Sequence, residues 1–235
     1  MVSARIERLP LLTAEECRQI RAAVYELRPH WRQRTPPMPF YTLGAASYLD
    51  AKSGENEYIA LAREYNPLLQ EHFGWVHERL MKGLVARLGL PAAYRQNGSL
   101  PGFHIFLADK EFRTMPAGIH VDNQYQLLDW KRCYFRCRQP ISFTVAISLP
   151  ARGSGLNVWN SSASELAALS TEEVTSQLLE PGRSYYYPHQ IGHVTLHFGH
   201  TIHQIAIPEH VEDSDERITL QGHGICCDGT FQIYW

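Results

Sequence analysis

The chain has 235 residues, which is long enough for one domain with a well-developed hydrophobic core. Apolar residues make up 44% of it and charged residues 20%, which is ordinary for a water-soluble globular protein. The formal net charge of −2 does not indicate the basic surface with which proteins bind nucleic acid or an anionic membrane, so we predict neither as a partner.

The N-terminus and the cysteines bear on the cellular location. Residues 1–10 alternate charged and apolar side chains and lack the pattern of a signal peptide, and no apolar run approaches the ~18 residues of a membrane span. Cys133 and Cys137 have the wrong spacing for a Cys-x-x-Cys motif, and the vicinal pair Cys226 and Cys227 would make a strained bridge. Together with Cys17 they are odd in number, so we predict reduced thiols and a cytoplasmic protein.

Helical signals dominate the first part of the chain. Thr13 and Glu16 form a capping-box pattern that predicts a helix ending near Leu27. A second helix is predicted over 67–88, because Pro67 suits a first helical turn and an apolar stripe follows it. The proline-rich segment 34–48 is predicted to be an ordered loop, and both helices are expected to buttress the core.

Short β-rich runs follow from Gly102 onward, separated by Gly, Pro and Asp clusters. They cover residues 103–107, 141–149, 183–187, 194–198, 202–207 and 218–221. Many short strands without intervening helices favour a sandwich or barrel over a βαβ sheet. We predict a single domain over 1–235, with a mainly helical part (1–95) and a mainly β core (96–235).

Histidines suggest a metal site. The chain contains 12, and more than half of them lie between His189 and His223. Upstream, His120 and Asp122 are separated by one residue, and on a strand such side chains point to the same side. That geometry can place an imidazole and a carboxylate on one metal ion.

Two further residues complete a pattern. His203 begins the second strand of a predicted strand–turn–strand segment, and Arg217 lies in the strand after it, with Thr219 facing the same side. Two histidines and one carboxylate form the facial triad of non-haem Fe(II) oxygenases, which leaves three cis positions open. 2-Oxoglutarate can fill two of these and leave one for O₂, and its distal carboxylate suits the two-pronged guanidinium of arginine.

The segments His120-Val121-Asp122, His203 and Arg217-Ile218-Thr219 resemble the His-x-Asp…His…Arg-x-Ser/Thr pattern of Fe(II)/2-oxoglutarate-dependent dioxygenases. The resemblance covers about residues 102–224. It implies a mainly β fold with α additions: a double-stranded β-helix (jelly-roll) core buttressed by the N-terminal helices. It also implies Fe(II), 2-oxoglutarate and O₂ as cofactor and co-substrates.

The implied reaction is hydroxylation of a C–H bond, with 2-oxoglutarate converted to succinate and CO₂. Halogenating members of the family have Gly or Ala in place of the carboxylate ligand, so Asp122 disfavours halogenation. We expect a small polar metabolite as substrate, such as an amino acid or a peptide-derived compound. The oligomeric state is not predicted.

Other residues are weaker candidates. In the family the strand before His-x-Asp often contacts the co-substrate, which suggests that role for His104, although packing in the core is an equal alternative. Thr144 and Thr219 are further co-substrate candidates. Asn123, Gln124 and Tyr125 follow the ligand pair and either contact the substrate or form an exposed loop.

Several alternatives stay open. His200 rivals His203 as the distal ligand but falls in the predicted turn. His197 is either a core histidine or part of the pocket wall, and His189 and His193 are expected to be solvated. His223 either supports the metal ligands or, as we expect, lies in a loop. The basic stretch with Arg132, Arg136 and Arg138 either binds a substrate carboxylate or is a solvated strand edge, and Trp159 either covers the site or fills the barrel end. A cupin-like, non-redox metal-binding protein is the alternative function, although such a site does not need Arg217 facing the metal.

Overall fold

The computed structural model describes residues 6–108, 118–130, 138–151, 154–162, 174, 176, 178–206 and 212–235. Its helices are α1 (Ala14–Glu26), α2 (Ser47–Asp50) and α3 (Glu55–Leu88), with 3-10 turns η1 (Arg28–His30) and η2 (Gln124–Leu127). Its strands are β1 (Ile6–Pro10), β2 (Arg32–Gln33), β3 (Phe40–Leu43), β4 (Ala92–Tyr94), β5 (Gly102–Leu107), β6 (Arg138–Ser148), β7 (Gly155–Ser162), β8 (Ser184–Pro188), β9 (His193–Phe198), β10 (Thr201–Ile205), β11 (Glu216–Cys227) and β12 (Thr230–Tyr234).

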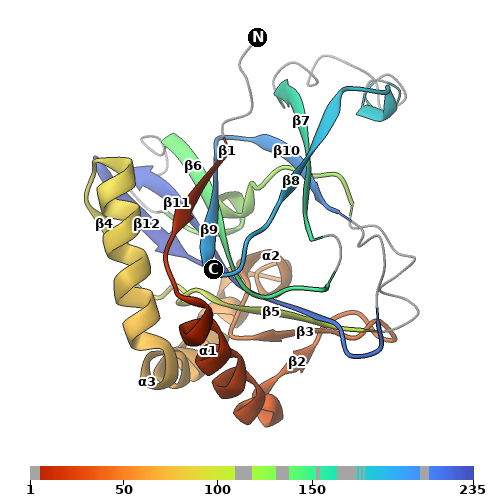
Figure 1. Ribbon diagram of the computed structural model, residues 1–235. Helices are drawn as coiled ribbons and strands as arrows, with labels where there is room; N and C mark the ends of the chain where they lie inside the picture. Colours follow the sequence, from red (N-terminus) through yellow and green to blue (C-terminus); the bar gives the residue numbers. More distant parts are fainter. Residues whose placement is uncertain are drawn as a thin grey trace.

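Two sheets form the core of the described chain. The larger sheet runs in the order β1-β9-β6-β11-β5-β3-β2, with β12 paired to β11 and β4 paired to β12. The smaller sheet has the order β10-β7-β8. In Figure 1 the smaller sheet lies on one side of the molecule, and α1 and α3 lie on the other. This arrangement confirms the predicted mainly β core with helical buttresses.

Helix α1 begins as its sequence predicts. The Thr13 side chain accepts a hydrogen bond from the Glu16 backbone N–H, and the Glu16 carboxylate accepts one from the Thr13 N–H at 2.8 Å. This capping box satisfies backbone donors that have no partner inside the helix. Cys17, Ile20 and Val24 then face the core, because they recur at helical spacing.

Helix α3 is longer than predicted and corrects the assignment of its start. It begins at Glu55, so Pro67 lies inside the helix rather than in its first turn. Proline removes one backbone hydrogen bond there, and buried side chains before and after it, such as Tyr58 and Phe73, offset that loss by packing on the core. Within the described part of the chain no helix is both long and apolar enough to cross a membrane.

The remaining elements show what the sequence pattern missed. All six predicted strands are present, but β11 extends well beyond 218–221. Strand β3 and the first two residues of α2 lie within the segment 34–48, which was predicted to be an ordered loop. Strands β1, β2, β4, β7 and β12 were not predicted. Of these, β1, β2, β4 and β12 have five residues or fewer and take their stability from pairing with a neighbouring strand, and β7 pairs with a strand on each side in the smaller sheet.

Alternation along the strands of the larger sheet separates two environments. On β6, Ile141, Val145 and Ile147 pack into the main hydrophobic core with side chains of α1 and α3. The residues between them on β6, Ser142 and Thr144, line a cavity on the opposite face of the sheet. One face of the sheet is therefore a structural core, and the other is available for a site.

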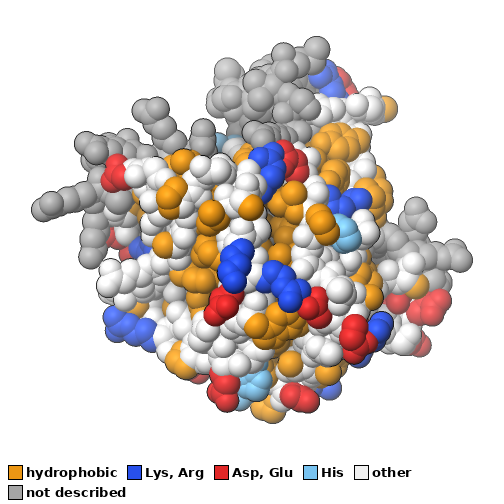
Figure 2. Space-filling model, turned by 60° about the vertical axis from the view of Figure 1, so that its left-hand side comes forward, with side chains coloured by type: hydrophobic (Ala, Val, Ile, Leu, Met, Phe, Trp, Pro, Cys, Tyr) orange, Lys and Arg blue, Asp and Glu red, His pale blue; other side chains and the backbone are white. Residues whose placement is uncertain are grey.

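On the side shown in Figure 2, the outer surface has no large region with charges of only one sign. Side chains of Lys and Arg lie close to those of Asp and Glu, with apolar side chains between them. On this face, then, any large ligand would be recognised by local contacts rather than by a long-range field.

We predict opposite effects for the same substitution at two glycines. Gly102→Ala should destabilise the fold by roughly 1–3 kcal/mol, because its Cβ would lie 2.1 Å from the Trp235 ring and 2.5 Å from the Leu43 carbonyl oxygen. Gly83→Ala in α3 should stabilise it by roughly 0.5–1 kcal/mol, since the new Cβ meets only Leu11, at 3.7 Å. Urea denaturation measures both; equal effects of the two substitutions would contradict the packing described here.

Candidate functional site

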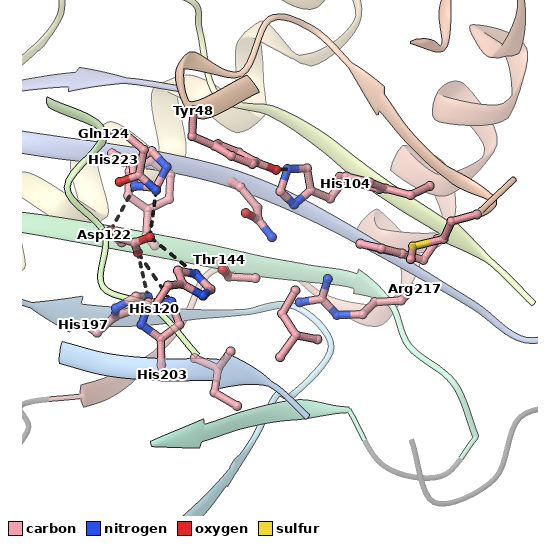
Figure 3. Close-up of a pocket in the computed structure, with 18 residues that line it drawn as sticks. Tyr48, His104, His120, Asp122, Gln124, Thr144, His197, His203, Arg217 and His223 are labelled. Carbon is pink, nitrogen blue, oxygen red and sulfur yellow. Dashed lines mark hydrogen bonds and ion pairs between the residues drawn. The ribbon is translucent and has the colours of Figure 1, made fainter. Parts of the chain in front are cut away.

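A cavity of about 290 Å³ lies between the inner face of the larger sheet and the smaller sheet. Its size is near the lower end of the range of small-molecule sites. Figure 3 shows the side chains around it. The lining residues are Met38, Phe40, Tyr48, His104, Phe106, His120, Asp122, Gln124, Ser142, Phe143, Thr144, Leu156, His197, His203, Ile205, Arg217, Gln221 and His223.

Three of these residues form a candidate metal centre. One ligand atom each from His120, Asp122 and His203 lies within 4.8 Å of the other two. Nε2 of His120 is 3.9 Å from Oδ1 of Asp122, and Nε2 of His203 is 3.7 Å from Oδ2. The side chains of Asp122 and His203 are buried, whereas that of His120 is 44% exposed and lies at the mouth of the cavity.

A backbone bridge fixes the two histidines side by side. The N–H of each residue donates to the carbonyl of the other, at 3.0 Å in both directions. His120 forms only this isolated bridge, which corrects the expectation that His120-Val121-Asp122 lies on a strand. The bridge nevertheless holds the pair where a strand would hold it.

Hydrogen bonds select the imidazole form that binds metal. Nδ1 of His120 lies 2.7 Å from the Gly118 carbonyl oxygen, and Nδ1 of His203 lies 2.8 Å from that of Thr201. A carbonyl oxygen only accepts, so each Nδ1 carries the proton and each Nε2 lone pair points to the metal centre. Burial also lowers the pKa of His203, which favours the neutral, metal-binding form.

Asp122 is held as a carboxylate. Burial favours the neutral acid, but the imidazoles of His203, His223 and their neighbours outweigh it and hold the pKa of Asp122 well below its usual range. The Gln124 side-chain amide donates to Oδ1 at 2.8 Å, which orients the carboxylate. Gln124 thus contacts Asp122 and also lines the cavity, and its predicted contact with substrate stays a prediction.

Arg217 lies at the other end of the cavity and reaches toward the metal centre (Figure 3). Its side chain is buried, and neither Nε nor Nη1 has a hydrogen-bond partner in the described chain. Burial lowers the pKa of Arg217 to about 10, so the guanidinium stays positive at neutral pH. A buried cation without an anionic partner is costly, and an anionic ligand would remove that cost.

An aromatic wall stands between these two ends. The Tyr48 hydroxyl and Nε2 of His104 are 2.6 Å apart, and the stacked rings of Phe40 and Phe106 have centroids 4.3 Å apart. Burial and the nearby Arg217 lower the pKa of His104 well below its usual value, so this imidazole is neutral. His104 therefore lines the cavity, where the sequence left core packing as an equal alternative.

The other predicted site residues are divided between the cavity and its surroundings. Thr144 lines the cavity. Thr219 is fully buried, and its hydroxyl accepts a hydrogen bond from Gln221 at 3.1 Å, so it supports the cavity floor. Asn123 is exposed and outside the lining, and the Tyr125 hydroxyl lies 3.2 Å from Nε2 of His200, at the rim.

Two histidine assignments were wrong. His223 lies in β11 and lines the cavity rather than a loop, because that strand continues past 221. His189 is buried rather than solvated, with Nδ1 3.0 Å from the Thr195 hydroxyl. His193 is partly exposed, and His197, one of the open alternatives, is part of the pocket wall.

Of the residues left open by the sequence, Trp159 lies at a buried position, and the others have side chains outside the described part of the chain. Trp159 is buried and donates its ring N–H to the Leu178 carbonyl at 2.7 Å. It packs beside Ile202 rather than lining the cavity. Cys133, Cys137, Arg132 and Arg136, and the Arg138 side chain, lie outside the described residues.

The sequence reasoning missed Tyr48, Ser142 and Gln221. Tyr48 arrives from α2, far away in the chain, and no local pattern marks it. Ser142 and Gln221 did carry a signal, namely polar residues at every second position of an otherwise apolar strand.

Solved structures with the same fold are oxygenases and related enzymes. An N-substituted L-amino acid dioxygenase from Burkholderia ambifaria AMMD, in complex with α-ketoglutarate (2-oxoglutarate), has a TM-score of 0.57 and 13% identity, covering 98% of this chain and 86% of that chain. EvdO2 from Micromonospora carbonacea var. aurantiaca has a TM-score of 0.54 and 13% identity, covering 96% and 87%. The non-heme α-ketoglutarate-dependent epimerase SnoN from nogalamycin biosynthesis has a TM-score of 0.52 and 15% identity, covering 94% and 79%.

No protein-family model and no curated protein sequence matches the chain. The structural matches show that this chain has the double-stranded β-helix fold shared with 2-oxoglutarate-dependent oxygenases. The predicted jelly-roll core is thereby confirmed.

We predict that Gln124→Leu weakens metal binding by about 10- to 100-fold, because the Asp122 carboxylate loses the donor that orients it. Titration of the metal-free protein with Co(II), followed by calorimetry, measures the change. Gln126→Leu is the matched control, since Gln126 is exposed two residues away. Equal affinities of the two variants would show that the Gln124 contact does not support the metal site.

Proposed function

We propose that this protein is an Fe(II)- and 2-oxoglutarate-dependent oxygenase that hydroxylates a C–H bond of a small polar metabolite. One observation carries the proposal: a two-histidine, one-carboxylate group and a buried arginine without an anionic partner among the described residues occupy opposite ends of one small cavity. The first suits a divalent metal, and the second suits the far carboxylate of a dicarboxylic acid.

His120, Asp122 and His203 would hold the iron. Two imidazoles with free Nε2 lone pairs and one ionised carboxylate are the ligand types of the facial triad. When bound, iron and 2-oxoglutarate supply the oxidising chemistry, with succinate and CO₂ as products and O₂ as the oxidant. In halogenating enzymes with this pattern, halide binds the iron in place of the carboxylate. Asp122 supplies that carboxylate here.

Arg217 would bind the distal carboxylate of 2-oxoglutarate. Two of its nitrogen donors have no partner in the described chain, and the planar guanidinium matches a carboxylate with two parallel hydrogen bonds. Thr144 and His104 line the wall between Arg217 and the metal centre, so both could contact the carbon chain or the carboxylates of the co-substrate. Thr219 would act indirectly, by fixing Gln221.

The rest of the wall would keep water from the reacting atoms. Phe40, Phe106, Leu156 and Ile205 are apolar, and low polarity strengthens the interactions of the buried charges. Gln124 orients Asp122 from behind, as described above. Each of these side chains therefore has a role in binding, orientation or exclusion of water.

We propose an amino acid or a peptide-derived compound as the substrate. The cavity volume of about 290 Å³ supports a small molecule, and one structurally similar protein is a dioxygenase of N-substituted L-amino acids. Asn123 and Tyr125 lie next to the metal ligands and are our candidates for contact with the substrate outside the cavity. We also propose a cytoplasmic location, since Cys17, Cys226 and Cys227 are thiols.

The cupin-like alternative accounts for the metal ligands but not for Arg217. A protein that only binds a metal has no use for a buried cation aimed at the metal centre, given what burial of such a charge costs. We therefore rank oxygenase activity first.

Anaerobic absorption spectroscopy tests the proposal. Fe(II) and 2-oxoglutarate added to the metal-free protein should give the weak visible charge-transfer band of an iron–2-oxo acid chelate. His203→Ala should abolish the band and His200→Ala should keep it, because His200 lies outside the ligand group. Binding of iron without this band would favour the cupin-like alternative, and the reverse pattern in the two variants would make His200 the ligand.

For Arg217→Lys we expect the dissociation constant of 2-oxoglutarate to rise at least about tenfold, or ~1.4 kcal/mol, because lysine keeps the charge but loses the two-pronged geometry. Metal affinity without co-substrate should be unchanged. The band above reports the titration. Arg183→Lys is the control, since Arg183 is exposed and pairs with Glu180. Wild-type affinity in Arg217→Lys would rule out Arg217 as the anchor.

A further inference from the structure

Tyr48 and His104 form a polar pair within the aromatic wall of the cavity. The Tyr48 hydroxyl lies 2.6 Å from Nε2 of His104, and both side chains line the cavity. Figure 3 shows Tyr48 pointing at the His104 ring. The other ring nitrogen, Nδ1 of His104, is buried and has no hydrogen-bond partner in the described chain. A ligand in the cavity could supply that partner.

The number of unsatisfied groups indicates where the ring proton of His104 lies. Burial raises the pKa of Tyr48 and lowers that of His104, so both side chains are neutral. If Nε2–H donated to the Tyr48 oxygen, the phenol proton and the Nδ1 lone pair would both lack a partner among the described residues. If the Tyr48 O–H donates to Nε2, only the Nδ1–H lacks one. The second arrangement is favoured, because each unsatisfied buried polar group costs free energy.

The short helix α2 is held in a fixed position, so Tyr48 keeps this contact. The Asp50 carboxylate accepts a hydrogen bond from the Ala46 N–H at 2.9 Å, and Nη1 and Nη2 of Arg34 donate to its two oxygens at 2.6 and 2.8 Å. The side chains of Arg34 and Asp50 are buried. A two-pronged contact between arginine and a carboxylate restricts both side chains. The backbone that carries Tyr48 is therefore positioned by the protein itself.

The register of the sheet places His104 beside Arg217. His104 of β5 pairs with Thr219 of β11, and Phe106 pairs with Arg217. His104 and Arg217 are therefore diagonal neighbours on the cavity face, and such neighbours are roughly 7–8 Å apart. One carboxylate between two donors can span this separation. After burial, the charge of Arg217 contributes most to lowering the pKa of His104, which agrees with their proximity.

We propose that Tyr48 is a positioning residue, whose hydroxyl fixes His104 as the Nδ1–H tautomer so that this N–H donates to the distal carboxylate of 2-oxoglutarate beside Arg217. This inference rests on the proposed function, because it assigns a second contact to the same co-substrate. A neutral N–H adds a directed hydrogen bond without burying a second positive charge. The pair should therefore favour 2-oxo acids that carry a second carboxylate.

Long-range proton–nitrogen NMR of the metal-free protein tests the tautomer. The signals of His104 are identified by their loss in His104→Phe. In wild type, Nδ1 of His104 should carry the proton. Tyr48→Phe keeps the ring but removes the hydroxyl, so the His104 signals should move to those of a mixture of tautomers. Tyr41→Phe is the matched control and should leave them unchanged, since Tyr41 lies in the neighbouring strand β3 but outside the cavity lining.

Titration with two 2-oxo acids tests the contact with the co-substrate, under the anaerobic Fe(II) conditions described above. His104→Phe should raise the Kd of 2-oxoglutarate by about tenfold, as expected for the loss of one hydrogen bond to a charged group, and Tyr48→Phe by about three- to tenfold. The Kd of 2-oxopentanoate, which has the same carbon chain without the distal carboxylate, should stay unchanged in both variants. The double variant should bind 2-oxoglutarate no more weakly than His104→Phe, because Tyr48 acts through His104. Circular dichroism establishes that the variants fold.

Three outcomes would overturn the inference while leaving the proposed function intact. Unchanged His104 signals in Tyr48→Phe would show that Tyr48 does not fix the tautomer. Equal weakening of both 2-oxo acids would show that His104 does not contact the distal carboxylate, and additive losses in the double variant would show that Tyr48 does not act through His104. If wild type binds no 2-oxoglutarate, the proposed function itself fails, and the contact proposed for His104 fails with it.

Discussion

The two-residue alternation of β11 is the constraint on which the site depends. Ile218 and Leu220 point into the core beneath the helices, so their neighbours in the strand must face the cavity. Arg217 and Gln221 are two of those neighbours, and both line it. A shift of register by one residue would bury the polar set in the core and expose the apolar set, so the packing of the core also fixes the chemistry of the site.

The cavity concentrates charge where burial is expensive. Asp122 and Arg217 are both buried, at opposite ends, and no direct ion pair between them is present in the described chain. A protein selected only for stability would pair such groups or replace them with apolar residues. A metal ion at one end and a dicarboxylate at the other would balance these two buried charges. The free-energy cost of burying Asp122 and Arg217 is therefore in line with the proposed function.

The tautomers of two candidate ligand histidines are also fixed by the protein itself. Carbonyl acceptors at Gly118 and Thr201 fix the protons of the two triad imidazoles on Nδ1. His197 has no such carbonyl acceptor among the described residues, so this kind of contact does not fix its tautomer. Local backbone geometry thus fixes the tautomer of some of the cavity histidines and not of others.

The sequence by itself determined the capping box of α1, the β-rich character of the second half, and the candidate triad with its arginine. These follow from short-range rules: hydrogen bonds three residues apart, side-chain alternation in strands, and ligand types that suit a metal. The sequence did not reveal the early start of α3, because the packing of Tyr58 and Phe73 on distant strands compensates for Pro67 inside the helix.

Only the tertiary structure decided which further histidines lie with His120 and His203 around the cavity. His197, His203 and His223 come from three strands, and His120 from a segment outside the regular strands, and their distances depend on how the two sheets face each other. Tyr48 enters the site from a short helix whose position is set by its contacts with α3 and the sheet. A local pattern can specify which way a side chain points from its own strand, but long-range packing specifies what it points at.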